Sequence, residues 1–99
     1  MSDEFSYEKT IFENEDKGFQ YRLVVSTFRD QEYLHLRKYF LSYEGEWVPT
    51  KEGAAIPCSI QNTYALLDGL LEVCSKAEGA DSIIHHLESK ITDLKLRTQ

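Results

Sequence analysis

Five side chains could in principle form a metal site or a nucleophile site: three histidines and two cysteines, namely His35, His85, His86, Cys58 and Cys74. Their spacing argues against both kinds of site. Adjacent residues on a helix point about 100° apart, so His85 and His86 cannot hold one metal ion as a pair four residues apart could. The cysteines occupy apolar positions of a predicted helix, as small core residues do. We therefore expect a protein that is not an enzyme and binds no metal and no cofactor.

Aromatic side chains lie beside charged residues in one segment, and this combination could form a binding surface. Residues 34–57, LHLRKYFLSYEGEWVPTKEGAAIP, mix aromatic rings with basic groups. Exposed rings can stack on unpaired bases, each contributing about 1 to 3 kcal/mol, while Arg and Lys follow the phosphates. Aromatic residues are also good strand formers that fill cores, and for any single ring that interpretation is favoured. The pattern alone leaves both a nucleic-acid module and a generic protein-binding domain open.

The net charge of −6 is unevenly distributed over the 99 residues. Residues 1–16 carry six acidic groups and one lysine, a net of −5, and residues 54–99 carry six acidic and four basic groups, a net of −2. Residues 17–53 carry six basic and five acidic groups, a net of +1, and hold eight of the twelve aromatic residues. A polyanion would therefore bind within residues 17–53.

Alternation in the same region predicts a β-hairpin. FQYRLVVST at residues 19–27 and EYLHLRKYF at residues 32–40 both alternate and are rich in strand formers. Between them, FRDQ forms a short polar connection. Turn residues at Gly45, Pro49 and Gly53 suit two brief edge strands, which makes four antiparallel strands.

Two amphipathic helices are expected after the strands. Apolar residues recur at helical spacing from Ile60 to Cys74, with Ser59 as the N-cap and Gly79 as the stop. A second helix opens near Asp81. The apolar surface of the first helix is wider than one small sheet can cover, which predicts a second protomer. The predicted fold class is α+β: a four-stranded antiparallel sheet followed by a helix (β-β-β-β-α), with an extra C-terminal helix, in a homodimer that forms through the helix 59–76.

Three segments follow from these patterns. We expect an acidic, flexible N-terminal tail over 1–17, a binding domain over 18–78 and a helical extension over 79–99. The tail could engage a protein partner. No stretch approaches the roughly 20 apolar residues that span a bilayer, and the N-terminus lacks the features of a signal peptide. An intracellular, cytoplasmic location without membrane contact is expected.

Residues 28–53, FRDQEYLHLRKYFLSYEGEWVPTKEG, resemble the single-stranded-DNA-binding domain of the transcriptional coactivator family known as positive cofactor four. That family shows an aromatic–basic turn, a strand ending in Arg-x-Tyr-aromatic, a Gly-Glu, a Pro and a basic Gly turn. The corresponding residues here are Phe28-Arg29, LRKYF at 36–40, Gly45-Glu46, Pro49, and Lys51 with Gly53. The resemblance extends over residues 19–77.

The resemblance implies a homodimer that presents paired channels for single-stranded DNA. Carried over by position, Phe28 and Phe40 would stack on bases, and Gly53 would allow the tight turn. The residues that would meet phosphates are Arg29, Arg37 and Lys51. Trp47 would supply an additional ring, and Arg22 completes the predicted DNA-binding set. Strict alternation puts Arg37 and Phe40 on opposite faces, so a bulge or the strand end must reconcile them.

Departures from the family pattern limit the expected affinity. Phe40 stands where Trp is common, and four positions that are usually basic are Ser26, Gln31, Val48 and Glu52. Fewer ionic contacts predict weaker, less salt-sensitive binding. The chain also lacks the Ser-rich and Lys-rich N-terminal region of eukaryotic members, which favours a bacterial or bacteriophage homologue. The predicted function is sequence-tolerant binding of single-stranded DNA in transcription, replication or recombination. The alternative is a protein-interaction module that recruits a polymerase or recombination factor without binding DNA.

Overall fold

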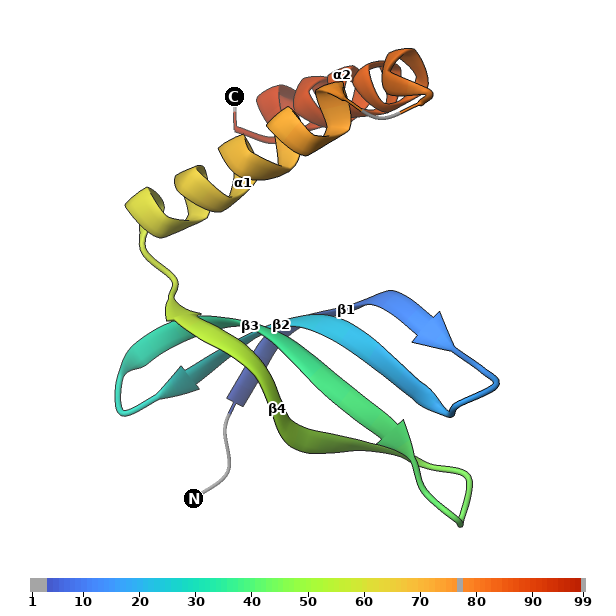
Figure 1. The fold of residues 1–99 in the computed structure, drawn as a ribbon. Helices are drawn as coiled ribbons and strands as arrows, with labels where there is room; N and C mark the ends of the chain where they lie inside the picture. Colours follow the sequence, from blue (N-terminus) through green and yellow to red (C-terminus); the bar gives the residue numbers. More distant parts are fainter. Residues whose placement is uncertain (1–3, 77, 99) are drawn as a thin grey trace. The chain divides into compact units, whose positions relative to one another are not determined.

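The computed structural model describes residues 4–76 and 78–98, which form four strands followed by two helices (Figure 1). The strands are β1 (Glu4–Asn14), β2 (Phe19–Phe28), β3 (Gln31–Leu41) and β4 (Trp47–Pro57). They form one sheet in the order β1-β2-β3-β4, and every neighbouring pair is antiparallel. The helices are α1 (Ile60–Ser75) and α2 (Ala80–Arg97). The predicted order of a four-stranded antiparallel sheet, a helix and an extra C-terminal helix is confirmed.

The chain divides into two compact units, residues 1–62 with the sheet and residues 63–99 with most of the helical part. This division differs from the predicted segments 1–17, 18–78 and 79–99. The N-terminal segment belongs to the sheet unit because β1 pairs along β2, and the body of α1 belongs with α2.

Strand β1 replaces the predicted flexible tail. Its residues pair with β2 along nearly their whole length, with register shifts between Phe5 and Tyr7 and between Thr10 and Phe12. These irregularities interrupt the alternation of inward and outward side chains from which a strand is predicted in a sequence. After the second shift Phe12 pairs with Tyr21 of β2, and the centroids of the Phe12 and Phe19 rings lie 6.1 Å apart. An edge strand tolerates Glu8 and Glu13 because their side chains stay exposed, and such charges oppose pairing with another sheet edge.

Strand β4 is one long strand where two brief ones were predicted. Its pairing with β3 shifts between Arg37↔Gly53 and Tyr39↔Pro49, so residues 50–52 bulge opposite Lys38. The Thr50 hydroxyl stabilises the bulge, because Oγ1 donates to the Lys38 carbonyl at 2.7 Å and accepts from the Glu52 amide at 3.1 Å.

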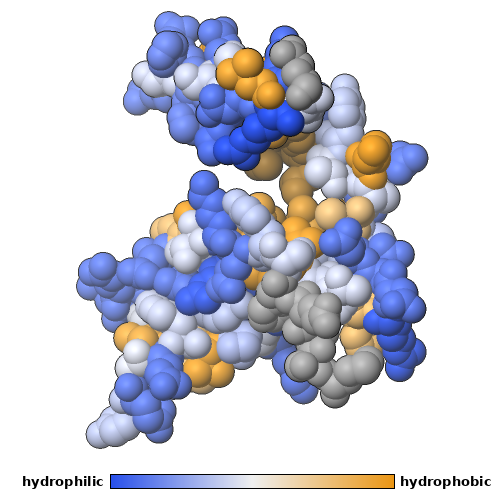
Figure 2. Space-filling model, turned by 180° about the vertical axis from the view of Figure 1, so that it is seen from behind, coloured by the Kyte–Doolittle hydropathy of each residue, from blue (hydrophilic) through white to orange (hydrophobic). Residues whose placement is uncertain are grey.

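The two faces of the sheet differ in chemistry. The register places the following β2 and β3 side chains on one side, called here the polar face: Gln20, Arg22, Val24, Ser26, Tyr33, His35, Arg37 and Tyr39. The other side, called the apolar face, carries Leu23, Val25, Leu34 and Leu36. Among the described residues the buried apolar side chains are Val24 and Tyr39, both on the polar face, whereas Leu36 is 44% exposed. Figure 2 shows hydrophobic surface on both the sheet unit and the helical unit.

Both helices expose apolar side chains. As predicted, Ser59 caps α1, because its Oγ accepts a hydrogen bond from the Asn62 amide at 3.1 Å. Gly79, the predicted stop of the first helix, is the N-cap of α2 and has a left-handed backbone with φ of 77°. No described residue of α1 or α2 is buried. Helices of this length owe most of their stability to packing of an apolar face, so these faces lack the cover that would stabilise them.

Candidate nucleic-acid interface

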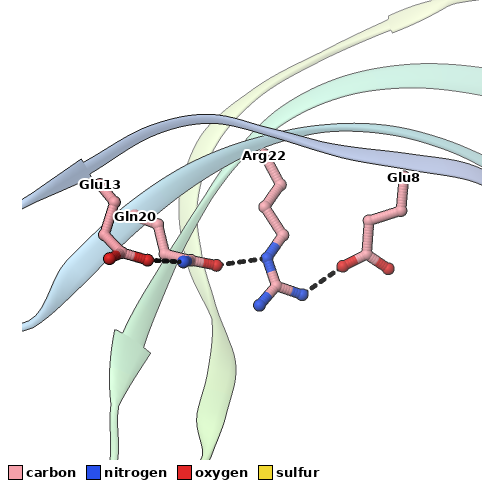
Figure 3. A network of polar contacts seen from close by, with 4 residues as sticks. All are labelled: Glu8, Glu13, Gln20 and Arg22. Carbon is pink, nitrogen blue, oxygen red and sulfur yellow. Dashed lines mark hydrogen bonds and ion pairs between the residues drawn. The ribbon is translucent and has the colours of Figure 1, made fainter.

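Arg22 of β2 is held at the centre of a polar network on the polar face (Figure 3). Its guanidinium forms an ion pair with Glu8 of β1, and its Nε donates to the side-chain oxygen of Gln20 at 2.5 Å. Gln20 in turn donates to a carboxylate oxygen of Glu13 at 2.5 Å. The guanidinium also lies over the ring of Tyr39, 4.1 Å from its centroid. Two carboxylates of β1 therefore hold this arginine through direct and relayed contacts.

A serine–histidine pair forms the middle of the polar face. Ser26 is 1% exposed, and its Oγ lies 2.6 Å from Nε2 of His35 on β3. A buried hydroxyl without a partner would cost about 1 to 3 kcal/mol, so the hydrogen bond stabilises both the strand pair and the ring orientation. The rings of Tyr33 and His35 lie 6.4 Å apart, tilted by 52°.

Two hollows open beside this pair. The larger, of about 320 Å³, is lined by Ser26, Phe28, Tyr33, His35 and Ala55. The smaller, of about 210 Å³, lies along β3 and β4, and its lining includes Arg37, Lys51 and Gly53. His35 and Ala55 line both hollows, which are therefore neighbours.

Gly53 permits the close approach of β4 to β3 at the smaller hollow. Its φ is +135°, a conformation that side chains with a Cβ rarely adopt. A Cβ there would lie 2.2 Å from the carbonyl oxygen of Leu36 and 3.0 Å from the Cα of Arg37. The predicted role of Gly53 in a tight turn is replaced by one at the strand bulge.

The connection between β2 and β3 presents a ring and a guanidinium together. Phe28 pairs with Gln31 across a two-residue turn, and both turn residues have positive φ, 52° at Arg29 and 65° at Asp30. Such a turn matches the twist of a hairpin, although glycine or asparagine is usual there. The Arg29 guanidinium lies 5.1 Å from the centroid of the Phe28 ring.

Seven of the eight predicted DNA-binding residues lie along the polar face or at its edges. Arg22, Phe28 and Arg37 project from it, Lys51 and Gly53 line the smaller hollow, and Arg29 lies in the adjoining turn. Trp47 pairs with Leu41, whose place in the alternation of β3 puts both at the far end of this face.

Phe40 lies on the other face of the sheet. It pairs with Phe19 and Val48, and neither pair belongs to the polar face. A bulge on β3 would place Phe40 on the polar face, but the bulge lies on β4, so the alternation of β3 continues through Arg37 to Phe40. The predicted grouping of Phe40 with Phe28 is therefore not found.

Sequence reasoning missed four side chains of the polar face. Ser26, Tyr33, His35 and Tyr39 are interior positions of predicted strands and were not among the predicted DNA-binding residues, although alternation predicts the last three on one face with Arg37, as the register confirms. The hydrogen bond of Ser26 had no sequence signal, because it depends on the register between β2 and β3.

Residues 4–76 and 78–98 contain no cluster of three or more His, Cys, Asp or Glu side chains that could hold a metal ion. Neither described helix is long and apolar enough to cross a membrane.

Comparison with known proteins finds one family match and a similar solved structure. Residues 16–59 match the family model described as Transcriptional Coactivator p15 (PC4). A solved structure, the bacteriophage T5 homologue of the eukaryotic transcription coactivator PC4, matches with a TM-score of 0.63 and 28% identity, over 96% of this chain and 98% of that one. That homologue is described as implicated in recombination-dependent DNA replication. No curated protein matches the chain. Residues 16–59, which include β2, β3 and β4, thus match the PC4 coactivator family, and the whole chain is similar in fold to the phage T5 homologue.

Proposed function

We propose that the polar face of the sheet binds single-stranded DNA without catalysing a reaction. The observation that carries the proposal is that rings and cations share this face: Phe28 beside Arg29 at one end, Arg37 and Lys51 in the middle, and Trp47 at the other end. Rings that stack on any base, with cations that follow the backbone, give binding with little sequence preference over most of the site.

The bound single strand of DNA would run along β3. Gln31 to Leu41 spans roughly 33 Å at about 3.3 Å per residue, long enough for several nucleotides to lie between Phe28 and Trp47. With about three phosphates neutralised, the logarithm of the binding constant would fall with a slope near −2 against the logarithm of salt concentration. Duplex DNA would bind more weakly, because its bases are already stacked and cannot reach the rings.

The comparisons support a process as well as a ligand. The T5 homologue is implicated in recombination-dependent DNA replication, a process that exposes single strands. We infer that this chain acts on the same kind of intermediate, in the cytoplasm of an infected or bacterial cell.

We also infer a homodimer that forms through α1. Leu67 and Leu70 of α1 are 52% and 54% exposed, and Leu36 and Ile56 of the apolar face are 44% and 37% exposed. Covering such surfaces would contribute about 25 cal/mol per Å². Sedimentation should give twice the mass of one chain, and a single-chain mass at micromolar concentration would contradict the dimer.

One observation favours the protein-interaction alternative. Glu8 and Glu13 make one side of the polar face acidic, and Glu8 forms an ion pair with a cation that could otherwise contact phosphate. A basic protein segment could bind there in place of DNA.

Two phenylalanines on opposite faces provide the test. Phe28 and Phe40 are similarly exposed, 41% and 44%. Loss of a stacking ring costs about 1 to 3 kcal/mol, so Phe28→Ala should weaken binding of a single-stranded 20-mer roughly 5- to 150-fold. Phe40→Ala should change affinity less than about threefold, since its ring faces away from the bound strand.

Fluorescence anisotropy measures both affinities, and circular dichroism verifies that both variants are folded. Equal effects of the two substitutions, or an effect of Phe40→Ala alone, would count against the polar face as the DNA site.

A further inference from the structure

The larger hollow on the polar face offers more than a site made only of stacking rings and phosphate contacts would need. Its lining combines the rings of Phe28 and Tyr33 with the polar pair of Ser26 and His35. Stacking alone would need an open ring surface. A hollow with a polar group in its wall can instead surround a base and contact its edge.

Strand β4 creates the hollow by supplying small residues. Ala55 lies directly opposite His35, and Gly53 lies opposite Arg37. Larger side chains at these two positions would fill the space that the hollows occupy. The bulge at residues 50–52 sets this register, since it shifts the pairing between Arg37 and Tyr39.

The neighbouring hollow supplies complementary chemistry. Arg37 and Lys51 line it, and it shares His35 and Ala55 with the larger hollow. A nucleotide joins a flat base to a charged phosphate through a short sugar linkage. An aromatic, partly polar hollow beside a cationic one matches that arrangement.

We propose that the larger hollow takes one unstacked base of the bound strand and that His35 contacts the edge of this base. Arg37 and Lys51 then contact an adjoining phosphate. Ser26 is a positioning residue, because its buried hydroxyl orients the His35 ring at 2.6 Å. This inference rests on the proposed binding of single-stranded DNA and adds to it one position at which the base is read.

The consequence is a modest base preference. A single hydrogen bond or its loss changes affinity by about fivefold, so the four bases should not bind alike at this position. The preference should depend on His35 and Tyr33, whereas affinity for the backbone should not.

Competition binding tests the inference. Unlabelled dA, dC and dT 20-mers and an abasic 20-mer compete with a labelled 20-mer for the wild type and for His35→Gln, which keeps a polar partner for Ser26. The affinities of the wild type for the three base-containing strands should differ by at least about fivefold, and this ratio of the highest to the lowest affinity is called the spread. His35→Gln should reduce the spread to about twofold and leave affinity for the abasic strand within about twofold.

Two further variants complete the design. His86→Gln makes the same exchange at an exposed position of α2 and should leave the spread unchanged. Tyr33→Leu removes the neighbouring ring and should also reduce the spread, which keeps the test decisive should His35→Gln unfold.

The outcomes separate the two proposals. A spread that survives in both hollow variants, or a wild type that binds the three strands alike, overturns the base-reading hollow while the DNA-binding function stands. A wild type that binds none of the strands overturns the proposed function and the inference together.

Discussion

At the residue scale, the ion pair between Glu8 and Arg22 controls how many cations the polar face offers to DNA. The pair is partly exposed, with 18% of the Arg22 side chain and 36% of the Glu8 side chain accessible to solvent. Partly exposed ion pairs contribute little to stability, so a phosphate can compete with Glu8 for the guanidinium.

Neutralising Glu8 should therefore strengthen binding. Glu8→Gln should raise affinity for a single-stranded 20-mer several-fold at low salt and steepen the salt slope by about 0.7, the contribution of one more phosphate contact. Salt-dependent anisotropy measures both quantities. Glu88→Gln removes the same charge from an exposed position on α2 and should have the smaller effect. Equal gains in DNA affinity in the two variants would show that the net charge of the protein, and not the release of Arg22, strengthens binding.

Gly53 tests the geometry of the smaller hollow. Its replacement by alanine places a Cβ 2.2 Å from the Leu36 carbonyl oxygen at φ of +135°. Gly53→Ala should lower the free energy of unfolding by at least about 2 kcal/mol. Gly45 also has positive φ, 84°, but a Cβ at Gly45 would meet no atom within 4 Å beyond its chain neighbours, so Gly45→Ala should cost only about 1 kcal/mol. Urea unfolding compares the free energies of unfolding of the two variants. Equal losses in Gly53→Ala and Gly45→Ala would contradict the close approach of β4 to β3.

At the element scale, β1 decides whether the acidic segment is a tail or part of the sheet. Deleting residues 2–14 removes an entire edge strand that pairs with β2. We expect the midpoint of thermal unfolding to fall by at least about 10 °C, because each kcal/mol lost shifts it by about 4 to 8 °C in a domain of this size. Circular dichroism measures the midpoint. An unchanged midpoint would show that the segment is dispensable to the fold, as a tail would be.

The elements differ in how far the sequence predicts them. Alternation suffices for most of β2 and β3, and Ser59 marks the start of α1, because these signals are local. The predicted four-residue connection FRDQ is a two-residue turn, since Phe28 and Gln31 still pair. Strand β1 escapes prediction because two register shifts interrupt its alternation and acidic residues suggest a tail. The two hollows could not be foreseen, since they depend on the register that the three-residue bulge on β4 imposes.

Phe40 shows the same limit at the candidate site. Position in a family motif grouped it with Phe28, while alternation put it on the opposite side from Arg37. Alternation gave the placement that the structure has, because the bulge is on the partner strand and leaves β3 regular. The side chains that build the hollows around Ser26 and His35 come from three strands, so no single segment reveals them.

At the scale of the whole molecule, the polar face accounts for how an acidic chain could bind a polyanion. The net charge of −6 opposes DNA binding at long range, but this repulsion is screened beyond about 10 Å at 0.1 M salt. Within that distance the rings and cations of the polar face act on the strand. Stacking does not weaken with salt, so affinity should depend on salt less than in a strongly basic protein.

The most direct test of this account is fluorescence anisotropy of labelled single-stranded and duplex 20-mers, titrated with the protein at two salt concentrations. The account predicts micromolar or tighter binding of the single strand, much weaker binding of the duplex and a salt slope near −2. Absence of binding to the single strand at low salt, or a preference for the duplex, would contradict it.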